Sequence, residues 1–217
     1  MRKTIYIFRL QLLLKCILAT FLMFVSSCYP QFENGLPVGR HLRIDKEITG
    51  SWFRSTENDK QQLLIYSRQD DWVDIIYIYD IESKTSRDGV NVLIFEGYTS
   101  VISKDKFLCF RLRKKDVRKT RNDAGSQEFS FLIVNYNVSD KGDLIIKSFS
   151  VEKAKQLVKQ GKLKGEIFER DPAEGRFFPS VIITSSSEKL AAVLSEEGVE
   201  QFIEEGPYGL MTFSRSK

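Results

Sequence analysis

The sequence predicts a mainly β fold, an antiparallel meander that forms a barrel or a sandwich, followed by two short helices in the C-terminal third. Seven short runs rich in β-branched and aromatic residues lie between residues 48 and 149. Turn signals such as Asp88-Gly89 and Asp140-Lys141-Gly142 separate consecutive runs. Beyond residue 149, apolar residues instead recur at the spacing of a helix.

The seven runs are the expected strands of the meander. They lie at residues 48–53, 63–66, 73–81, 92–95, 106–113, 129–136 and 144–149. The run at 73–81 carries large side chains on both faces at its centre. Further short strands are expected at residues 163–168, 181–184 and 210–214.

Two helices are expected among these later strands. Ser150 caps the first helix, which Gly161 ends. A capping box of Ser185 and Glu188 starts the second helix. The inward faces consist of Val151, Ala154, Leu157 and Val158 in the first helix, and of Leu190, Val193 and Leu194 in the second.

Residues 1–27 have the three parts of a secretory signal peptide: a basic start, an apolar middle and small residues before a cleavage site. Arg2 and Lys3 supply the positive charge. The unbroken apolar run at residues 16–25 is shorter than the roughly 20 apolar residues of a membrane-spanning helix. We therefore expect residues 1–27 to be cleaved off.

The end of this segment, Val25-Ser26-Ser27-Cys28, resembles the lipobox of bacterial lipoproteins. The resemblance implies that the Cys28 thiol takes a diacylglycerol, that a peptidase cuts before it, and that a fatty acid such as palmitate acylates the new N-terminus. Each buried CH₂ contributes about 0.8 kcal/mol, and several chains together anchor a protein stably. The resemblance also implies the outer membrane, facing the periplasm, because Tyr29 and not an aspartate follows the cysteine. The alternatives to a lipoprotein signal are an ordinary signal peptide, beside which Cys28 is incidental, and an uncleaved anchor.

The mature chain is expected to consist of a tether and one folded unit. Residues 28–41 contain two prolines and two glycines but few large apolar residues, which is typical of a lipidated tether. Residues 42–217 are expected to form a single β-barrel-like domain, large enough for a substantial core.

The net charge of +4 belongs to the export signal. Residues 1–27 hold four of the 33 basic residues and no acidic residue, so 29 basic residues remain against 29 acidic ones. A neutral domain lacks the basic footprint of most nucleic-acid-binding proteins, so we expect no nucleic-acid partner.

Cysteine and histidine are scarce in the mature chain. With Cys28 acylated, Cys109 is the remaining thiol, so no intramolecular disulfide forms and Cys109 packs within a strand. His41 is the single histidine, which argues against two-histidine metal sites and most Ser-His or Cys-His catalysis. We therefore expect no cofactor, no metal and no enzymatic activity. A hydrolase that uses scattered carboxylates is an alternative.

Gly50 and Trp52 lie in the first expected strand, and Arg215 lies near the C-terminus. Gly-x-Trp in the first strand of a β-meander resembles the lipocalins and their calycin relatives. In those proteins the Trp closes one end of the barrel, beneath an Arg from near the C-terminus. The resemblance implies a lipocalin-like barrel with structural roles for these three residues, and a cation–π contact contributes about 0.5 to 2 kcal/mol. Alternatively, Trp52 is a core residue of another β fold.

A basic run extends from the end of the fifth strand into the loop that follows. Such a loop can contact anionic lipid head groups, at about 1 kcal/mol per basic residue. The alternative is an ordinary solvated hairpin loop. The run consists of Arg111, Arg113, Lys114, Lys115, Arg118, Lys119 and Arg121.

Aromatic residues of the strands are candidates for the inner wall of the barrel. Aromatic walls suit an apolar or amphipathic ligand, although the same side chains fill a ligand-free core equally well. The candidates are Tyr66, Tyr77, Tyr79, Phe95, Phe110, Phe129, Phe131 and Tyr136.

Together these patterns predict a non-enzymatic envelope lipoprotein that binds an apolar or amphipathic ligand. Its expected partners are membrane lipid, through acylated Cys28, and a hydrophobic small molecule. The alternative is a structural or assembly protein that binds another envelope protein through its outer surface.

Overall fold

The computed structural model describes residues 29–38, 44–56, 59–68, 72–81, 90–113, 130–168, 181–205 and 209–216. Within these ranges, no helix combines the length and apolar character needed to cross a membrane. Several sequence-based predictions fall on residues outside the described ranges and stay predictions. They concern residues 1–27, Cys28, His41, Phe129, Lys114, Lys115, Arg118, Lys119 and Arg121.

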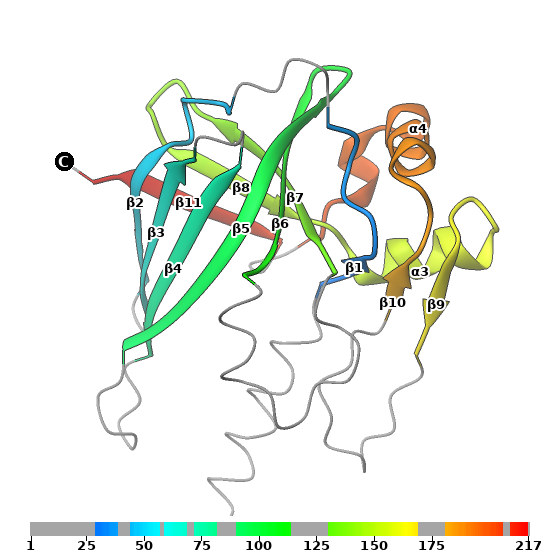
Figure 1. Cartoon of the computed structure of the whole chain (residues 1–217), viewed down its shortest axis with the longest axis horizontal. Coiled ribbons are helices and arrows are strands. Elements are labelled where there is room, and N and C mark those ends of the chain that lie inside the picture. The colour runs from blue at the N-terminus through cyan, green and yellow to red at the C-terminus, as the bar shows by residue number, and fades with distance from the viewer. Residues whose placement is uncertain are drawn as a thin grey trace, which may run out of the picture.

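Eight antiparallel strands in the described part of the chain close into a barrel (Figure 1). Neighbours along the chain pair from β2 to β8, and β11 pairs with both β8 and β2. The predicted fold class, a mainly β barrel with two helices toward the C-terminus, is confirmed. The strands are β2 (Gly50–Ser55), β3 (Asp59–Ser67), β4 (Val73–Ile81), β5 (Val90–Ile102), β6 (Asp105–Leu112), β7 (Leu132–Val138), β8 (Leu144–Ser148) and β11 (Leu210–Arg215).

The two ends of the barrel differ, and we name them by what lies there. At the plugged end, the turn at residues 44–49 lies ahead of β2, and tight turns join β5 to β6 and β7 to β8. The far end is the opposite one. There β2, β4, β6 and β8 end, and β3, β5, β7 and β11 begin.

A second layer covers the outer face of β5–β7 (Figure 1). Outward-facing Phe107, Cys109 and Ile133 pack with Leu157 and Leu194 in one buried cluster, so these barrel strands are buried on both faces. The layer consists of a three-stranded sheet, β1 (Gln31–Phe32), β10 (Val181–Ile183) and β9 (Gly165–Ile167), the helices α3 (Val151–Lys159) and α4 (Ser187–Glu197), and the 3-10 helix η1 (Val199–Phe202).

The N-terminal segment belongs to this layer, so the predicted tether is wrong for residues 30–38. β1 pairs in parallel with β10, and Phe32 exchanges two backbone hydrogen bonds with Phe131, at 2.9 and 2.6 Å. The Tyr98 hydroxyl donates to the Leu36 carbonyl at 2.7 Å. Phe32 is 3% exposed and Leu36 is 1% exposed.

Glycine and proline, which suggested a tether, serve here to fit the chain closely against the barrel. A Cβ added to Gly35 would lie 2.1 Å from the Tyr98 hydroxyl oxygen, so a side chain at this position has no room. Phe32 and Leu36 are isolated apolar residues among glycines and prolines, so they give no periodic pattern. Individual tertiary contacts hold this segment in place.

Both predicted helices are confirmed, but the cap of the second is shifted by one residue. Ser150 caps α3 as predicted, whereas Ser186 and not Ser185 caps α4. Ser185 is buried instead, and its hydroxyl accepts a hydrogen bond from the Lys164 amide at 2.7 Å. Three consecutive serines offer equivalent caps in the sequence, and packing of the first one decides between them.

β5 is much longer than the predicted strand at residues 92–95. It continues through Gly97, where the apolar pattern stops, to Ile102. A Cβ at Gly97 would lie 2.6 Å from the Cys109 carbonyl oxygen of β6, so the close approach of the two strands requires glycine inside the strand.

We predict that Phe32→Ala lowers the free energy of unfolding by about 3 to 5 kcal/mol, because it empties a buried site in which the ring packs edge-on against Phe149 at 6.1 Å. Val38→Ala is the matched control in the same segment. Val38 is 62% exposed, and its truncation should change stability by less than about 0.5 kcal/mol. Equilibrium urea unfolding measures both, and equal effects would contradict the packing described for this segment.

Candidate functional site

Trp52 closes the plugged end from within the barrel wall and is 0% exposed. Arg215 of β11 pairs with it across the strands, and the guanidinium carbon lies 4.7 Å from the ring centroid. The Trp52 indole donates to the Ile48 carbonyl at 2.7 Å, and Arg215 donates to the Glu47 carbonyl at 2.7 Å. The expected contact between Trp52 and Arg215 is therefore present, and both side chains also fix the plugging turn.

The same turn is held from inside the barrel by a polar cluster. Asp45 accepts hydrogen bonds from the Lys106 ammonium at 2.8 Å, the Tyr136 hydroxyl at 3.1 Å and the Glu47 amide at 3.0 Å. The turn ends at Gly50, whose φ of 130° lies in a region that favours glycine. Gly50 thus has the structural role that the sequence predicted for it.

Hydrogen bonding keeps Asp45 ionised in this cluster. Burial raises the pKa of its carboxyl, but the bonds from Lys106, the Glu47 amide and Tyr136, with the charge of Lys106, outweigh burial and leave the pKa below its ordinary value. Burial and the nearby Asp45 charge raise the pKa of Tyr136, so the phenol stays protonated and donates. The ionised Asp45 carboxylate therefore holds the turn at the plugged end through charge-assisted hydrogen bonds.

Apolar side chains fill the interior of the barrel next to this polar cluster. Trp52, Ile65, Val73, Leu144 and Phe213 are each at most 1% exposed and belong to one buried cluster. This half of the barrel is a packed core, as in many small barrels.

Toward the far end, the inward-facing side chains are partly exposed. Trp52, Leu63 and Tyr77 form one inward row across β2–β4, and Tyr77 continues it to Leu93 on β5. Leu112, also inward, is 41% exposed. Solvent therefore reaches the inner face here, and we take this face as the candidate site. It consists of Arg54, Gln61, Tyr77, Tyr79, Leu93, Phe95, Phe110, Leu112, Leu132 and Met211.

Most of the aromatic residues proposed for the inner wall do lie on it. Tyr77, Tyr79, Phe95, Phe110 and Tyr136 face inward by strand register. Tyr66 faces outward instead and is 50% exposed, and Phe131 packs against Tyr98 in the outer layer. The residue next to Tyr66, Ile65, takes the inward position, and the sequence alone did not fix that phase.

Polar groups lie at one side of this aromatic face. The Arg54 guanidinium donates to the Gln61 side-chain oxygen at 3.3 Å, and Gln61 pairs across the strands with Tyr79. The Tyr79 ring stacks on Tyr77 with centroids 5.4 Å apart. An apolar wall with a few convergent polar groups suits an amphipathic molecule whose polar end lies near Arg54.

No family model, curated protein or solved structure matches this chain. The lipoprotein and lipocalin resemblances therefore rest on residues of this sequence alone. Within the described ranges, no group of three or more His, Cys, Asp or Glu side chains is placed to hold a metal ion.

The structure describes two residues of the predicted basic run, and both are held on the outer wall. Arg111 pairs with Glu96 at 3.0 Å and lies over the Trp72 ring at 5.3 Å. Arg113 forms an ion pair with Asp74. Their side chains are 23% and 18% exposed, so these two guanidinium groups are engaged by the barrel and do not project from a solvated loop.

An apolar strip crosses the outer wall of β2–β5. Leu64, Ile76 and Ile94 form one outward row of half-buried side chains, and Phe53 and Val92 are 44% and 51% exposed. Because β4 contributes to this outer strip as well as to the interior, the strand predicted at residues 73–81 has large side chains on both faces. Because solvent-facing sheet surfaces are usually polar, this strip is a candidate interaction surface.

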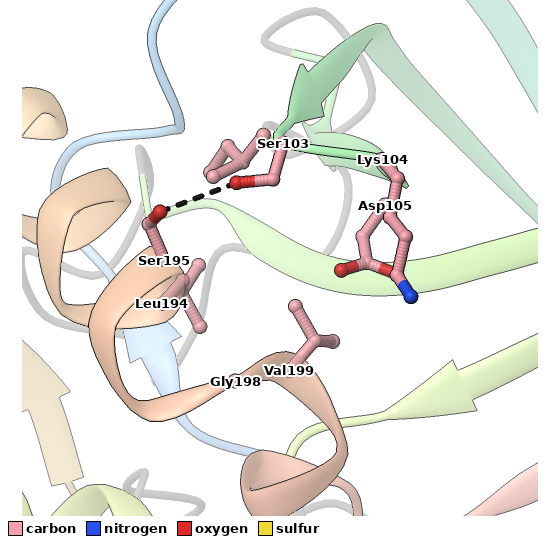
Figure 2. A pocket seen from close by; sticks show the side chains of 8 residues that line it. Ser103, Lys104, Asp105, Leu194, Ser195, Gly198 and Val199 are labelled. Carbon is pink, nitrogen blue, oxygen red and sulfur yellow. Dashed lines mark hydrogen bonds between the residues drawn. The ribbon is translucent and has the colours of Figure 1, made fainter.

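A pocket of about 380 Å³ lies outside the barrel, between the β5–β6 turn and the junction of α4 with η1 (Figure 2). The hydroxyls of Ser103 and Ser195 point at each other across it, 3.2 Å apart, and Leu194 and Val199 form its apolar side. Its eight lining residues include no histidine, and no hydrogen bond joins Lys104 or Asp105 to either serine hydroxyl (Figure 2). The two hydroxyls satisfy one another, so the pocket is a weaker candidate than the inner face.

Sequence reasoning missed the polar residues of the interior. Arg54 was identifiable, because it lies two residues beyond Trp52 in a strand and therefore shares its face. Asp45 gave no signal, because it precedes the strand pattern and its partners, Lys106 and Tyr136, lie about 60 and 90 residues away along the chain.

We predict that Arg215→Ala lowers the free energy of unfolding by about 1 to 2 kcal/mol, because it removes the cation–π contact and the bond to Glu47. In a double-mutant cycle with Trp52→Leu, which removes the aromatic face, the coupling energy should be at least about 0.5 kcal/mol. Urea unfolding of the four proteins measures it. Strictly additive effects would mean that the ring contact contributes nothing.

Proposed function

We propose that this protein is a non-enzymatic, lipid-anchored envelope lipoprotein whose barrel binds an amphipathic ligand on its inner face at the far end. The observation that supports ligand binding most directly is the contrast between the two halves of the interior. Side chains fill the half beside Trp52, whereas Leu93, Phe110 and Leu112 on the other half are only partly buried. Removing such side chains from water is the usual driving force for binding an apolar ligand.

The chemistry of this face favours a ligand with a polar end. Arg54 brings a positive charge onto an otherwise apolar and aromatic surface, and the Gln61 side chain to which it donates is neutral. A carboxylate or phosphate near Arg54 and an apolar body against Tyr77 and Leu93 would match these groups.

Anchoring is proposed at Cys28. Acyl chains on this cysteine would hold the domain at the membrane of the cell envelope, and the lipobox favours the outer membrane on its periplasmic side. The neutral mature chain removes electrostatic support for a nucleic-acid partner.

A second candidate is a structural role through the outer wall. The apolar strip that includes Leu64, Ile76 and Ile94 supports it, because an envelope protein with a complementary apolar surface could cover this strip. The two candidate functions use opposite faces of the same strands. Substitutions at two neighbouring residues of one strand can therefore distinguish between them.

We predict that Leu93→Asp weakens binding of the apolar fluorescent probe N-phenylnaphthylamine at least about tenfold, which corresponds to about 1.4 kcal/mol. The charge would stand on the inner face, where the probe should lie. Ile94→Asp places the same charge one residue further along β5, on the outer wall, and should change probe affinity less than about twofold. Fluorescence titration measures the affinity, and circular dichroism checks that both variants fold.

Equal weakening by both variants, or no probe binding by the unmodified protein, would contradict a ligand site on the inner face. If instead only Ile94→Asp abolishes a specific crosslink to an envelope protein in cells, the outer-wall function is favoured.

We predict that Cys28→Ser moves the protein from the membrane fraction to the soluble fraction and removes the acyl mass from the mature chain. Cys109→Ser is the control, because Cys109 is buried in the barrel wall and its loss should leave the protein on the membrane. A Cys28→Ser protein that stays fully membrane-bound would indicate that residues 1–27 form an uncleaved anchor.

A further inference from the structure

We infer that the far end of the barrel faces the bilayer and contacts its lipid surface directly. The inference rests on the proposed acylation of Cys28 and adds an orientation to it. Its evidence is the length of chain between Cys28 and the fold, the place where that chain joins the barrel, and the side chains exposed there.

The chain that joins Cys28 to the folded domain is very short. Pro30 is already buried, and Gln31 is paired with Ile182 of β10. Three extended residues span at most about 11 Å. The head-group layer on each side of a bilayer is about 5 to 8 Å thick. A domain held so closely cannot extend away from the surface on a tether, and the part of it nearest Gln31 must lie against the lipid.

That part of the domain is the far end. Phe32 bridges to Phe131, the residue just before β7 begins at the far end. From there the N-terminal segment runs along the outside of the barrel toward the plugged end, where the Leu36 carbonyl meets Tyr98 of β5 (Figure 1). The anchored cysteine and the far end are therefore on the same side of the molecule.

At this end, apolar side chains are exposed that a lipid surface could cover. Phe53, Val92, Leu112 and Leu210 are between 41% and 51% exposed, and they come from four different strands, β2, β5, β6 and β11. Proteins that lie on membranes bury such side chains about 5 to 10 Å into the boundary between head groups and acyl chains. The anchor position thus selects this end, and the exposed rim offers the lipid apolar side chains to cover.

This orientation narrows the ligand class of the proposed site. The inner face with Tyr77, Leu93 and Phe110 would open toward the lipid, so an amphiphile could move between bilayer and barrel without crossing water. Its polar end would stay near Arg54, on β2 close to the far end. The expected ligand is therefore a membrane lipid with an anionic head group.

The test uses the full chain, processed and acylated in a bacterial host, purified and reconstituted into vesicles of phosphatidylethanolamine and phosphatidylglycerol. A fluorophore is attached to an introduced cysteine, Leu210→Cys at the far end or Val101→Cys at the plugged end. Both native residues are exposed, at 50% and 61%, so neither substitution disturbs the core. Native Cys109 stays unlabelled because it is fully buried and burial raises its pKa to about 12.

Lipids that carry a nitroxide in the head group should quench the Leu210→Cys label at least about threefold more than the Val101→Cys label, because only the first lies within the interfacial layer. Equal quenching at both positions in vesicle-bound protein would overturn the orientation while leaving the acyl anchor in place. Stronger quenching at Val101→Cys would reverse the orientation. Protein without acyl mass and without vesicle binding would remove the proposed anchor, and the orientation with it.

Discussion

The structure depends on the burial of β5–β7 on both faces. A closed barrel needs only its inner face covered, yet Phe107, Cys109 and Ile133 point outward as apolar side chains and require a second layer. Helices α3 and α4, strands β9 and β10 and the 3-10 helix η1 provide most of that layer, and residues 30–36 complete it. This requirement explains why Phe32 and Leu36 are among the most buried residues although they precede the barrel.

The two ends of the barrel differ in the side chains that occupy them. At one end, Trp52 with Arg215 and Asp45 with Lys106 fix a turn over a packed core. At the other end, the inner face remains partly exposed and includes Arg54. A rigid, packed half supports an accessible half, an arrangement that suits binding because the site-bearing strands are already ordered.

The sequence predicted the parts of this molecule that follow from local periodicity. The strands and both helices are of this kind, because alternation and spacing reveal them. The meeting of Trp52 with Arg215 was instead implied by the resemblance to the lipocalins. The sequence-based predictions failed where a single tertiary contact decides the local structure. Gly35 signalled a tether but fits beneath Tyr98, and Ser185 resembled a cap but is buried. The sequence predicted that aromatic residues line the inner face, but it did not show which of two neighbouring residues points inward. Strand register places Ile65 inward and Tyr66 outward.

Residues 30–36 are a fixed part of the fold, and with the proposed acylation of Cys28 they would hold the barrel close to the membrane. Amide hydrogen exchange tests the packing of this segment most directly, because the Phe32 and Glu33 amides donate to the Phe131 and Ile183 carbonyls at 2.9 Å. We expect a peptide covering these residues to be protected as strongly as peptides from β5 and β6. Exchange of that peptide at the rate of an unfolded chain would contradict it, since residues 28–41 would then be a free tether.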